Sequence, residues 1–342
     1  MIVRSRAPLR LGLAGGGTDV SPYSEQHGGY VMNVTIDKFA YATIDPSPSG
    51  QVEFHALDSS SVQQFDPDEV DLLPGPQQLM RGVYLHVADR LLGGMHPAIR
   101  VRTHSDAPPG SGLGSSSTMV VTLVAAFNEY FGLALGEYEI AHLAYEIERK
   151  DLGLSGGKQD QYAAAFGGFN FMEFYAGDRV IVNPLRIKDW VWCELEASLV
   201  LYFTGVSRAS AAIIDEQARN VREGRSESIE AMHRLKQEAV QMKEALLRGD
   251  LGRFAEVMQS GWQAKKASAS SITNPLIDRI EALAFANGAK AAKVSGAGGG
   301  GFMMFMCDPA DRVRLVTALS GAGGRVYDTH FTPYGATSWK IG

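Results

Sequence analysis

A loop with glycine at every second position stands directly before a long apolar stretch, and this arrangement constrains the chain more than any other feature. The loop is Pro108–Ser117, with glycine at 110, 112 and 114, and the apolar stretch is Met119–Phe127. Alternate glycines let successive backbone N–H groups converge, and a helix N-terminus carries unpaired N–H groups and a partial positive charge. A flexible surface loop would not explain why a buried helix starts at once. The pattern therefore predicts an anion-binding site of the kind that holds phosphate.

Two other phosphate-binding motifs do not fit. A Walker A loop requires Gly-Lys-Ser/Thr at a spacing that Pro108–Ser117 lacks. The spacing G-x-G-x-x-G occurs at residues 296–301, but Phe302–Cys307 after it has the pattern of a strand, whereas the dinucleotide fold needs a helix there. The segment Lys293–Gly301 is better explained as a turn between strands that presents bare backbone to a ligand.

A further glycine-rich loop, Leu13–Asp19, lies near the N-terminus. Residues 15–17 are all glycine, and Thr18 and Asp19 follow with a hydroxyl and a carboxylate. This pair suits hydrogen bonds to a polyol, and a tight turn with an N-capping aspartate explains it equally well.

Two acidic residues between the loops are candidates for catalysis. Glu148 lies one residue past the apolar stripe of an amphipathic helix, about 100° from its core-facing line. Asp160 follows a glycine loop, where aspartate is commonly a helix cap. Only a position beside the phosphate site would make either one catalytic. Gly153–Gly157 matches G-x-S-x-G, but a helix precedes it where a hydrolase needs a strand.

Composition excludes several classes of protein. The 342 residues include 32 Lys+Arg and 38 Asp+Glu, and the net charge of −6 gives no general attraction to nucleic acid. Cys193 and Cys307 allow neither a disulfide framework nor a structural zinc site, so both are interpreted as small core residues. The N-terminal apolar run is too short for a signal peptide, and Met119–Phe127 is too short to cross a bilayer. We therefore expect a cytoplasmic protein without membrane segments.

Hydrophobic periodicity indicates an α+β fold, because strands and helices follow one another without regular βαβ alternation. Strands are predicted at residues 1–13, 31–36, 39–44, 52–55, 99–103, 169–174, 190–203, 289–294 and 301–307. Helices are predicted at residues 76–92, 116–131, 138–150, 159–166, 229–246, 251–265 and 275–287. The predicted elements change in kind, because long amphipathic helices dominate the second part of the chain. We place the boundary near residues 176–190 and expect two domains, 1–185 and 186–342.

The three glycine loops, in this order, resemble those of the GHMP small-molecule kinase superfamily, which includes galactokinase, homoserine kinase and mevalonate kinase. Pro108–Ser117 resembles its phosphate loop, Lys293–Gly301 its C-terminal motif, and Pro8–Asp19 its N-terminal motif. Residues 15–17 depart from the pattern, since galactokinases and mevalonate kinases have Gly-Glu-His there. The resemblance implies a two-domain α+β fold with the active site in the cleft between the domains, and ATP and Mg²⁺ as cofactors.

The resemblance also implies roles for particular residues. Asp160 would be the catalytic aspartate, Arg10 would face the transferring phosphoryl group, and Ser116 with Glu148 would hold Mg²⁺. The expected ATP-binding residues are Pro109, Gly110, Ser111, Gly112, Leu113, Gly114, Ser115, Ser116 and Ser117. The expected substrate-binding residues are Gly16, Gly17, Thr18, Asp19, Lys158, Gln159, Thr204, Arg208, Gly298 and Gly299.

Three segments bear on the substrate. Residues 15–19, 156–161 and 202–208 together resemble the bacterial kinases of D-glycero-D-manno-heptose 7-phosphate. Such an enzyme would phosphorylate the anomeric hydroxyl to give the 1,7-bisphosphate, for heptose in surface polysaccharides. A fucokinase-like enzyme acting on an unphosphorylated sugar is the nearest alternative. A non-catalytic sugar or nucleotide sensor is a third, against which the presence of Asp160, Ser116 and Glu148 argues.

A substrate that already carries a phosphate needs a second cationic pocket. Arg208 and Lys158 are candidates on charge alone, and either could equally be a surface residue. The expected partners are thus a sugar phosphate and ATP, with no nucleic acid and no membrane, and the sequence predicts no particular oligomeric state.

Overall fold

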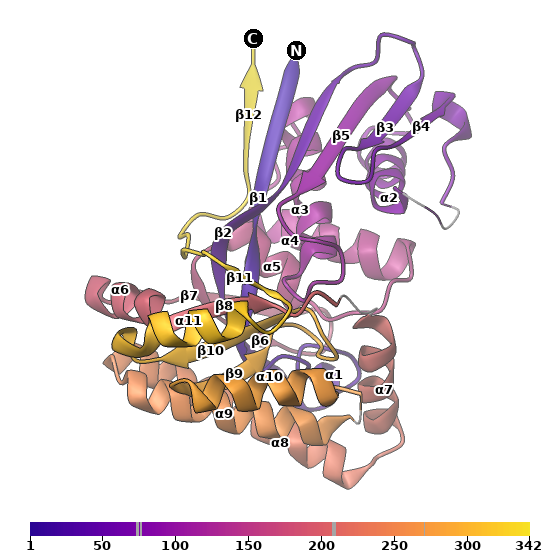
Figure 1. The fold of residues 1–342 in the computed structure, drawn as a ribbon. Helices are drawn as coiled ribbons and strands as arrows, with labels where there is room; N and C mark the ends of the chain where they lie inside the picture. The colour runs from indigo at the N-terminus through magenta and orange to yellow at the C-terminus, as the bar shows by residue number, and fades with distance from the viewer. Residues whose placement is uncertain (73–74, 76, 207–209, 270) are drawn as a thin grey trace.

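The structure is a computed structural model that describes the whole chain except residues 73–74, 76, 207–209 and 270. Strands and helices are mixed, as expected of an α+β fold, and they form two sheets that helices cover (Figure 1). In the part of the chain that the structure describes, no helix is both long and apolar enough to cross a membrane.

The first sheet is built on two long antiparallel strands, β1 (Ile2–Ala14) and β2 (Gly29–Pro46). Its other strands are β3 (Val52–Ala56), β4 (Ser61–Phe65), β5 (Ile99–Ser105), β6 (Phe169–Phe174), β7 (Val180–Pro184) and β12 (Thr337–Ile341). Because β12 pairs with β1, the two ends of the chain lie side by side (Figure 1).

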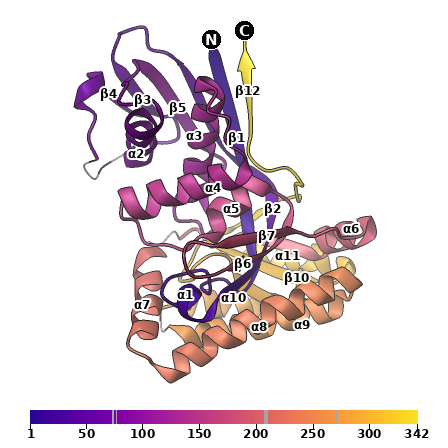
Figure 2. The same cartoon turned by 180° about the vertical axis from the view of Figure 1, so that it is seen from behind.

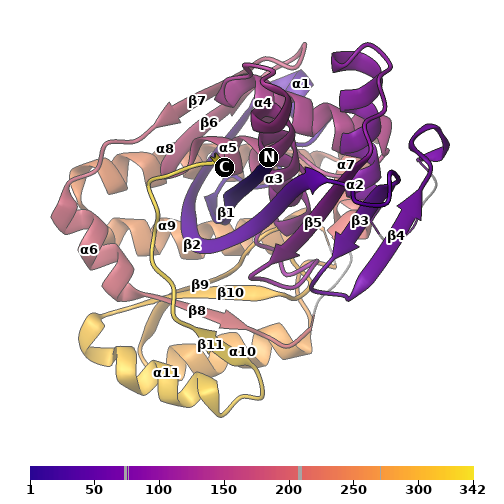
Figure 3. The same cartoon turned by 90° about the horizontal axis from the view of Figure 1, so that it is seen from above.

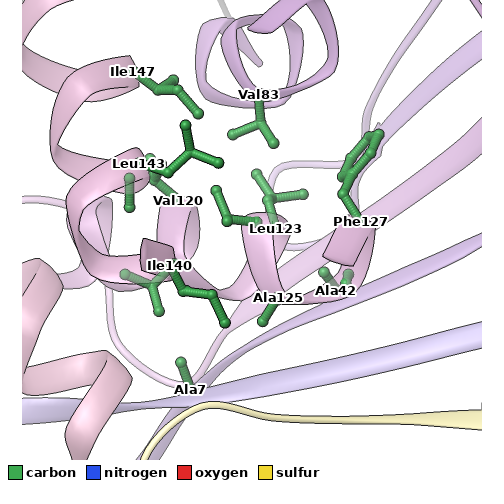
Figure 4. Close-up of a cluster of buried hydrophobic side chains, with 14 of the residues drawn as sticks. Ala7, Ala42, Val83, Val120, Leu123, Ala125, Phe127, Ile140, Leu143 and Ile147 are labelled. Atoms are coloured by element: carbon green, nitrogen blue, oxygen red, sulfur yellow. The ribbon is translucent and has the colours of Figure 1, made fainter. Parts of the chain in front are cut away.

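Helices with apolar residues at helical spacing pack on one face of this sheet. They are α2 (Gln78–His86), α3 (Ser115–Phe131), α4 (Glu137–Tyr145) and α5 (Gln159–Phe166). The central helix is α3, whose Val120, Leu123 and Phe127 enter a cluster with side chains of α2 and α4 (Figure 4). This central position explains why the segment after the alternating glycines is almost wholly apolar.

The second sheet has the strand order β11-β8-β10-β9. Its strands are β8 (Leu199–Phe203), β9 (Ala289–Val294), β10 (Phe302–Cys307) and β11 (Arg325–Tyr327). The helices that pack with it are α9 (Leu251–Ser268), α10 (Pro275–Ala286) and α11 (Arg312–Ser320). Helix α8 (Ser226–Arg248) packs against α9 and against β1 and β2 of the first sheet. In Figure 3, α10 and α11 lie on one side of β10 and α9 on the other. Alternate side chains of β10 therefore enter two different cores, one on each face of the sheet. As a result, every residue of β10 is buried.

Three further helices complete the fold: α1 (Tyr23–His27), α6 (Asp189–Ser198) and α7 (Ser210–Arg222). Two π-helical turns, Val87–Leu91 and Glu146–Asp151, extend α2 and α4. Short 3₁₀ turns occur at Pro67–Glu69 and Pro309–Asp311.

One hydrophobic core joins the two sheets. Leu9 and Leu11 of β1 lie in the same cluster as Met242 and Leu246 of α8 and Met304 of β10. Figure 2 shows α8 and α9 side by side below the ends of these strands. The division into residues 1–185 and 186–342 stays a prediction, and β12 from the second part completes the sheet of the first.

Several predicted elements need correction. Residues 31–36 and 39–44 belong to one strand, β2, whose pairing with β1 shifts between Pro8 and Arg10, since a bulge absorbs the extra residues. Residues 190–203 are not one strand, because α6 occupies the first part and buries Val191 and Leu195, four positions apart. The same helix leaves Cys193 exposed, against the prediction, whereas Cys307 is buried as expected.

Candidate active site

A cleft of about 280 Å³ lies where the three glycine loops meet. Both halves of the chain line it, the first with the N-terminal and phosphate loops and the second with α7, α9 and the third glycine loop. In the described part of its lining, the charged residues are Arg10, Asp19, Glu148, Arg149, Asp160 and Lys265. Five of these six come from the first half of the chain, and Lys265 comes from α9.

The loop before α3 adopts the backbone that its alternate glycines permit. The φ angles of Gly110, Gly112 and Gly114 are 70°, 86° and 76°, in the region that side chains disfavour. Gly114 is the N-cap of α3, and no side chain of the described residues caps the first N–H groups of that helix. All three glycines and Ser115–Ser117 line the cleft. The helix therefore presents unpaired donors and the positive end of its dipole to the cleft, as an anion requires.

The third glycine loop supports the phosphate loop. The Phe302 N–H donates to the Ser111 carbonyl at 2.9 Å, and a Cβ on Gly112 would overlap the Ser295 carbonyl oxygen. The backbones of the two loops are in direct contact here, so no side chain fits between them. Gly298 and Gly299 pack against Ile272 and are not part of the cleft lining, in contrast to Gly296.

Arg10 and Asp160 form an ion pair in the cleft, although 150 residues separate them. The Arg10 guanidinium donates from Nε to Asp160 Oδ1 at 2.7 Å, and Nη2 lies 2.7 Å from the same oxygen. Its Nη1 donates to the Gly112 carbonyl at 2.7 Å. Arg10 thus links the candidate catalytic carboxylate to the phosphate loop.

Arg10 owes its burial to the covering loops rather than to its place in the strand. Arg4 and Arg6 have the same parity in β1 and are exposed, whereas Arg10 is buried. The Arg10 N–H donates to the Leu113 carbonyl at 3.1 Å, so the phosphate loop lies over the strand at this point.

Asp19 holds the start of α5 in place. Its Oδ2 accepts hydrogen bonds from the N–H groups of Lys158 and Gln159 at 2.9 and 3.0 Å. Asp19 therefore does not cap the next helix along the chain, α1, whose N-cap is Pro22, but binds the first N–H groups of a helix about 140 residues away in sequence. Burial and the nearby Asp160 charge raise the pKa of Asp19, and the donated hydrogen bond of Gln159 opposes them.

Thr18 serves the turn rather than the cleft. Its hydroxyl donates to backbone carbonyls of Gly15 and Tyr30 at 2.8 and 2.9 Å, and the residue is fully buried. It is absent from the cleft lining, which includes Gly16, Gly17 and Asp19.

Glu148 lies beside the phosphate loop. The Ser116 hydroxyl donates to Glu148 Oε1 at 2.7 Å, and the Gln161 amide donates to Oε2 at 2.7 Å. Glu148 is 2% exposed, so it is not the solvated residue that its helical position alone indicates. It lies in the π-helical turn Glu146–Asp151, where the Leu152 N–H bonds to the Ile147 carbonyl five residues back. This wider turn changes the direction in which the side chain leaves the helix.

Lys265 and Arg149 are charged residues of the described lining that the sequence patterns do not predict as site residues. The Lys265 ammonium donates to the Gly296 carbonyl, and the residue is 4% exposed. Burial and the charge of Arg10 lower the pKa of Lys265 to about 8, and Asp19 and Asp160 oppose this shift. The burial of Lys265 in the cleft is what marks it as a functional residue. That burial is not visible in the sequence, because a single lysine in a helix is usually exposed.

Other expected site residues lie elsewhere. Lys158 is buried, its ammonium pairs with Asp178 at 2.7 Å, and it is not in the cleft lining, so it does not offer a charge to a substrate there. The Thr204 hydroxyl donates to the Gly301 carbonyl at 3.0 Å. Arg208 lies outside the described residues. Of the expected ATP-binding set, Pro109, Ser111 and Leu113 are not in the lining.

Both halves of the chain match known families. Residues 78–168 match the GHMP kinases N terminal domain, and residues 242–325 match the GHMP kinases C terminal domain. The sequence is 46% identical to a D-glycero-alpha-D-manno-heptose 7-phosphate kinase of Campylobacter jejuni, over 99% of both chains.

Two further relatives bear on the substrate. A crystal structure described as a D-glycero-D-manno-heptose 1-phosphate kinase from Bacteroides thetaiotaomicron is 47% identical, with a TM-score of 0.83 and coverage of 99% of both chains. An L-fucokinase/L-fucose-1-P guanylyltransferase of Bacteroides fragilis is 28% identical over 93% of this chain and 36% of its own length.

Proposed function

Because the chain belongs to the GHMP kinase family, we propose that this ATP-dependent sugar kinase phosphorylates D-glycero-D-manno-heptose 7-phosphate at the anomeric hydroxyl to give the 1,7-bisphosphate. The observation that carries the proposal is the Arg10–Asp160 pair beside the uncapped N-terminus of α3. The heptose is supported by two relatives of 46% and 47% identity, both named as kinases of a heptose phosphate. Their names differ in the position of that phosphate, so the experiment below compares the two.

Asp160 receives the acceptor hydroxyl in this mechanism. Both short contacts of Arg10 end on Oδ1, which leaves Oδ2 without a hydrogen-bond partner among the described residues. Oδ2 faces the phosphate loop, 3.2 Å from where a Cβ on Gly114 would lie. It therefore orients the sugar hydroxyl and accepts its proton as the bond to phosphorus forms.

The phosphate loop and Arg10 stabilise the charge on the transferring group. The transition state of phosphoryl transfer is loose, so positioning and charge neutralisation supply most of the catalysis. In this proposal the first N–H groups of α3 would bind the ATP phosphates. The Arg10 guanidinium, which donates to the Gly112 carbonyl of the phosphate loop at 2.7 Å, would neutralise charge on the γ-phosphoryl group.

Ser116 and Glu148 fit a magnesium ion. Among the described residues there is no group of three or more His, Cys, Asp and Glu for a metal, but Mg²⁺ needs only one or two protein oxygens when phosphates and water complete its shell. A hydroxyl and a carboxylate oxygen 2.7 Å apart beside the phosphate loop supply these ligands. When bound, the ion would neutralise charge between the β- and γ-phosphates. Arg149 Nη1 lies 3.2 Å from Glu148 Oε1 and holds this carboxylate in position beside the phosphate loop.

The product of such a kinase would supply heptose for bacterial surface polysaccharides, since a sugar 1-phosphate is the form that nucleotidyl transfer activates. A fucokinase-like activity on an unphosphorylated sugar is the second candidate, favoured by the likeness to the fucokinase of Bacteroides fragilis.

The test measures ATP consumption with four acceptors: the heptose 7-phosphate, the heptose 1-phosphate, the free heptose and L-fucose. The product position is read by ³¹P NMR. We expect the highest kcat/KM with the 7-phosphate and a new anomeric phosphate in the product. A preference for the 1-phosphate or for a free sugar would contradict the proposed substrate and leave the kinase assignment intact.

A further inference from the structure

Three cationic side chains line the described part of the cleft, and two of them are already engaged. Arg10 is paired with Asp160. Arg149 lies 3.2 Å from Glu148 and donates to Ser117 Oγ and the Leu154 carbonyl. Lys265 has no carboxylate oxygen within 4.0 Å among the described residues, and its one hydrogen-bond partner there is the Gly296 carbonyl. An ammonium has three donors, so two remain for a ligand.

The space beside the Lys265 ammonium is open on the side of the N-terminal glycine loop. A Cβ on Gly16 would lie 3.9 Å from Lys265 Nζ and 3.6 Å from Gln159 Nε2. Any side chain at position 16 would therefore grow into this space. Glycine keeps this volume free, and two donor groups face it: the Lys265 ammonium and the Gln159 carboxamide. One N–H of that carboxamide donates to Asp19 Oδ1 at 3.2 Å, and the second remains for a ligand.

This arrangement suits an anionic group of the acceptor. The cleft lining near Lys265 includes the carboxylates of Asp19 and Asp160, which would repel a phosphate. Asp19, however, already accepts four N–H hydrogen bonds, from the backbone of Gly17, Lys158 and Gln159 and from Gln159 Nε2 at 3.2 Å. Asp160 is paired with Arg10. Among the described residues of the cleft lining, Lys265 is therefore the cation that is not paired with a carboxylate.

We propose that Lys265, with Gln159 Nε2, binds the phosphate that the acceptor sugar already carries. This inference rests on the proposed function, because it assigns the second phosphate site of that acceptor. A charge-assisted hydrogen bond from a desolvated ammonium to a phosphate is stronger than the same contact in water. The site thereby distinguishes a sugar phosphate from the free sugar.

The test compares Lys265→Met and Lys265→Arg with the wild type on two acceptors, the heptose 7-phosphate and the same heptose without its phosphate. Lys266→Met is the matched control, because Lys266 is the next residue of α9, pairs with Glu281 at 2.7 Å and lies outside the cleft lining. ATP binding and the thermal midpoint of each variant establish that the fold is intact.

We expect Lys265→Met to raise KM for the phosphorylated acceptor roughly 10–100-fold, the usual cost of a charged hydrogen bond. The kcat/KM for the unphosphorylated acceptor should change less than about threefold, and Lys265→Arg should recover part of the loss. An equal loss of kcat with both acceptors would overturn the inference and move Lys265 to the transferring phosphoryl group. If the wild type itself did not prefer the phosphorylated acceptor, the proposed substrate would fail first, before any variant is compared.

Discussion

At the scale of single residues, Asp160 has one carboxylate oxygen, Oδ1, bound by Arg10, and its other oxygen, Oδ2, faces the phosphate loop at Gly114. Asp160→Asn keeps the shape and an oxygen for Arg10, but it removes the group that accepts the proton. We expect kcat to fall at least ~100-fold with little change in the Kd of ATP. Steady-state assays at saturating substrate measure kcat, and calorimetric titration measures the Kd of ATP. A variant with more than a tenth of the wild-type kcat would not fit this role.

Ser116 and Glu148 form a second residue-level pair, joined by a 2.7 Å hydrogen bond. If both contact one magnesium ion, Ser116→Ala and Glu148→Gln should each raise the Mg²⁺ concentration that gives half-maximal rate. The double variant should show less than the sum of the two effects, since both act on one ion. The measurement is the rate as a function of Mg²⁺ at saturating ATP. Strict additivity would separate Glu148 from the ion.

The buried ammonium of Lys265 has a cost in stability. Its pKa is lowered to about 8 from 10.5, mainly by burial, and the groups that face it are Arg10, Asp19 and Asp160, with Lys293 on β9. Between these two pH values the unfolded chain binds more protons than the folded one, so this lysine makes stability rise with pH across that window. Below pH 8 the charge is present in both states and the cost is complete.

Lys265→Met should therefore be more stable than the wild type at pH 7, by on the order of 1–3 kcal/mol, since a unit of pKa shift corresponds to about 1.4 kcal/mol and the lost Gly296 contact offsets part of the gain. The advantage should shrink towards pH 10. Urea unfolding at pH 7 and pH 10 gives both values. A variant less stable than the wild type at pH 7 would contradict a net cost of the buried charge.

At the scale of elements, the phosphate loop and the third glycine loop support each other through backbone contacts. Gly112→Ala should weaken ATP binding at least ~10-fold, because the new Cβ would overlap the Ser295 carbonyl oxygen and separate the loops. Calorimetric ATP titration measures the effect. Gly94→Ala is the control, since Gly94 has a similar φ of 84° but open space around its Cβ position. Equal effects of the two variants on ATP binding would exclude contact between the loops as the cause.

The π-helical turn that carries Glu148 is a second element with a local function. The amphipathic pattern of the preceding helix is regular, and a regular continuation would leave Glu148 off the buried face. The wider turn brings the carboxylate to Ser116 and Gln161 instead. Such turns commonly occur at functional sites, because they redirect one side chain without ending the helix.

At the scale of the whole molecule, the core that joins the two sheets should make the chain unfold as one unit. Leu246 is fully buried in this core, and Leu246→Ala should lower the free energy of unfolding by about 2–5 kcal/mol. Far-UV circular dichroism and tryptophan fluorescence should report the same lowered midpoint. Leu247→Ala, at the neighbouring exposed position, should have little effect. Two separate transitions would mean that the halves unfold independently.

The local parts of the fold were predictable because they depend on periodicity and on glycine. The helix at Gln159–Phe166 and the strand at Phe169–Phe174 have the predicted bounds, and the buried helix after the phosphate loop begins within one residue of its predicted start. The predicted strand at 190–203 was wrong in its first part, since a short apolar segment fits either periodicity. The edge strand β12 and the short strand β11 carry too few apolar residues to be seen.

The three glycine loops, the buried helix behind one of them and the residue types at the site follow from the sequence alone, because they depend on local backbone freedom and on side-chain chemistry. Which charges meet depends on the packing of the chain. Arg10 reaches Asp160 because the phosphate loop covers β1, Asp19 caps a helix about 140 residues away, and Lys158 is turned away to Asp178. Lys265 enters the cleft from a helix whose pattern marks no such position. Contacts over these separations follow from the packing of whole elements, which no local pattern encodes.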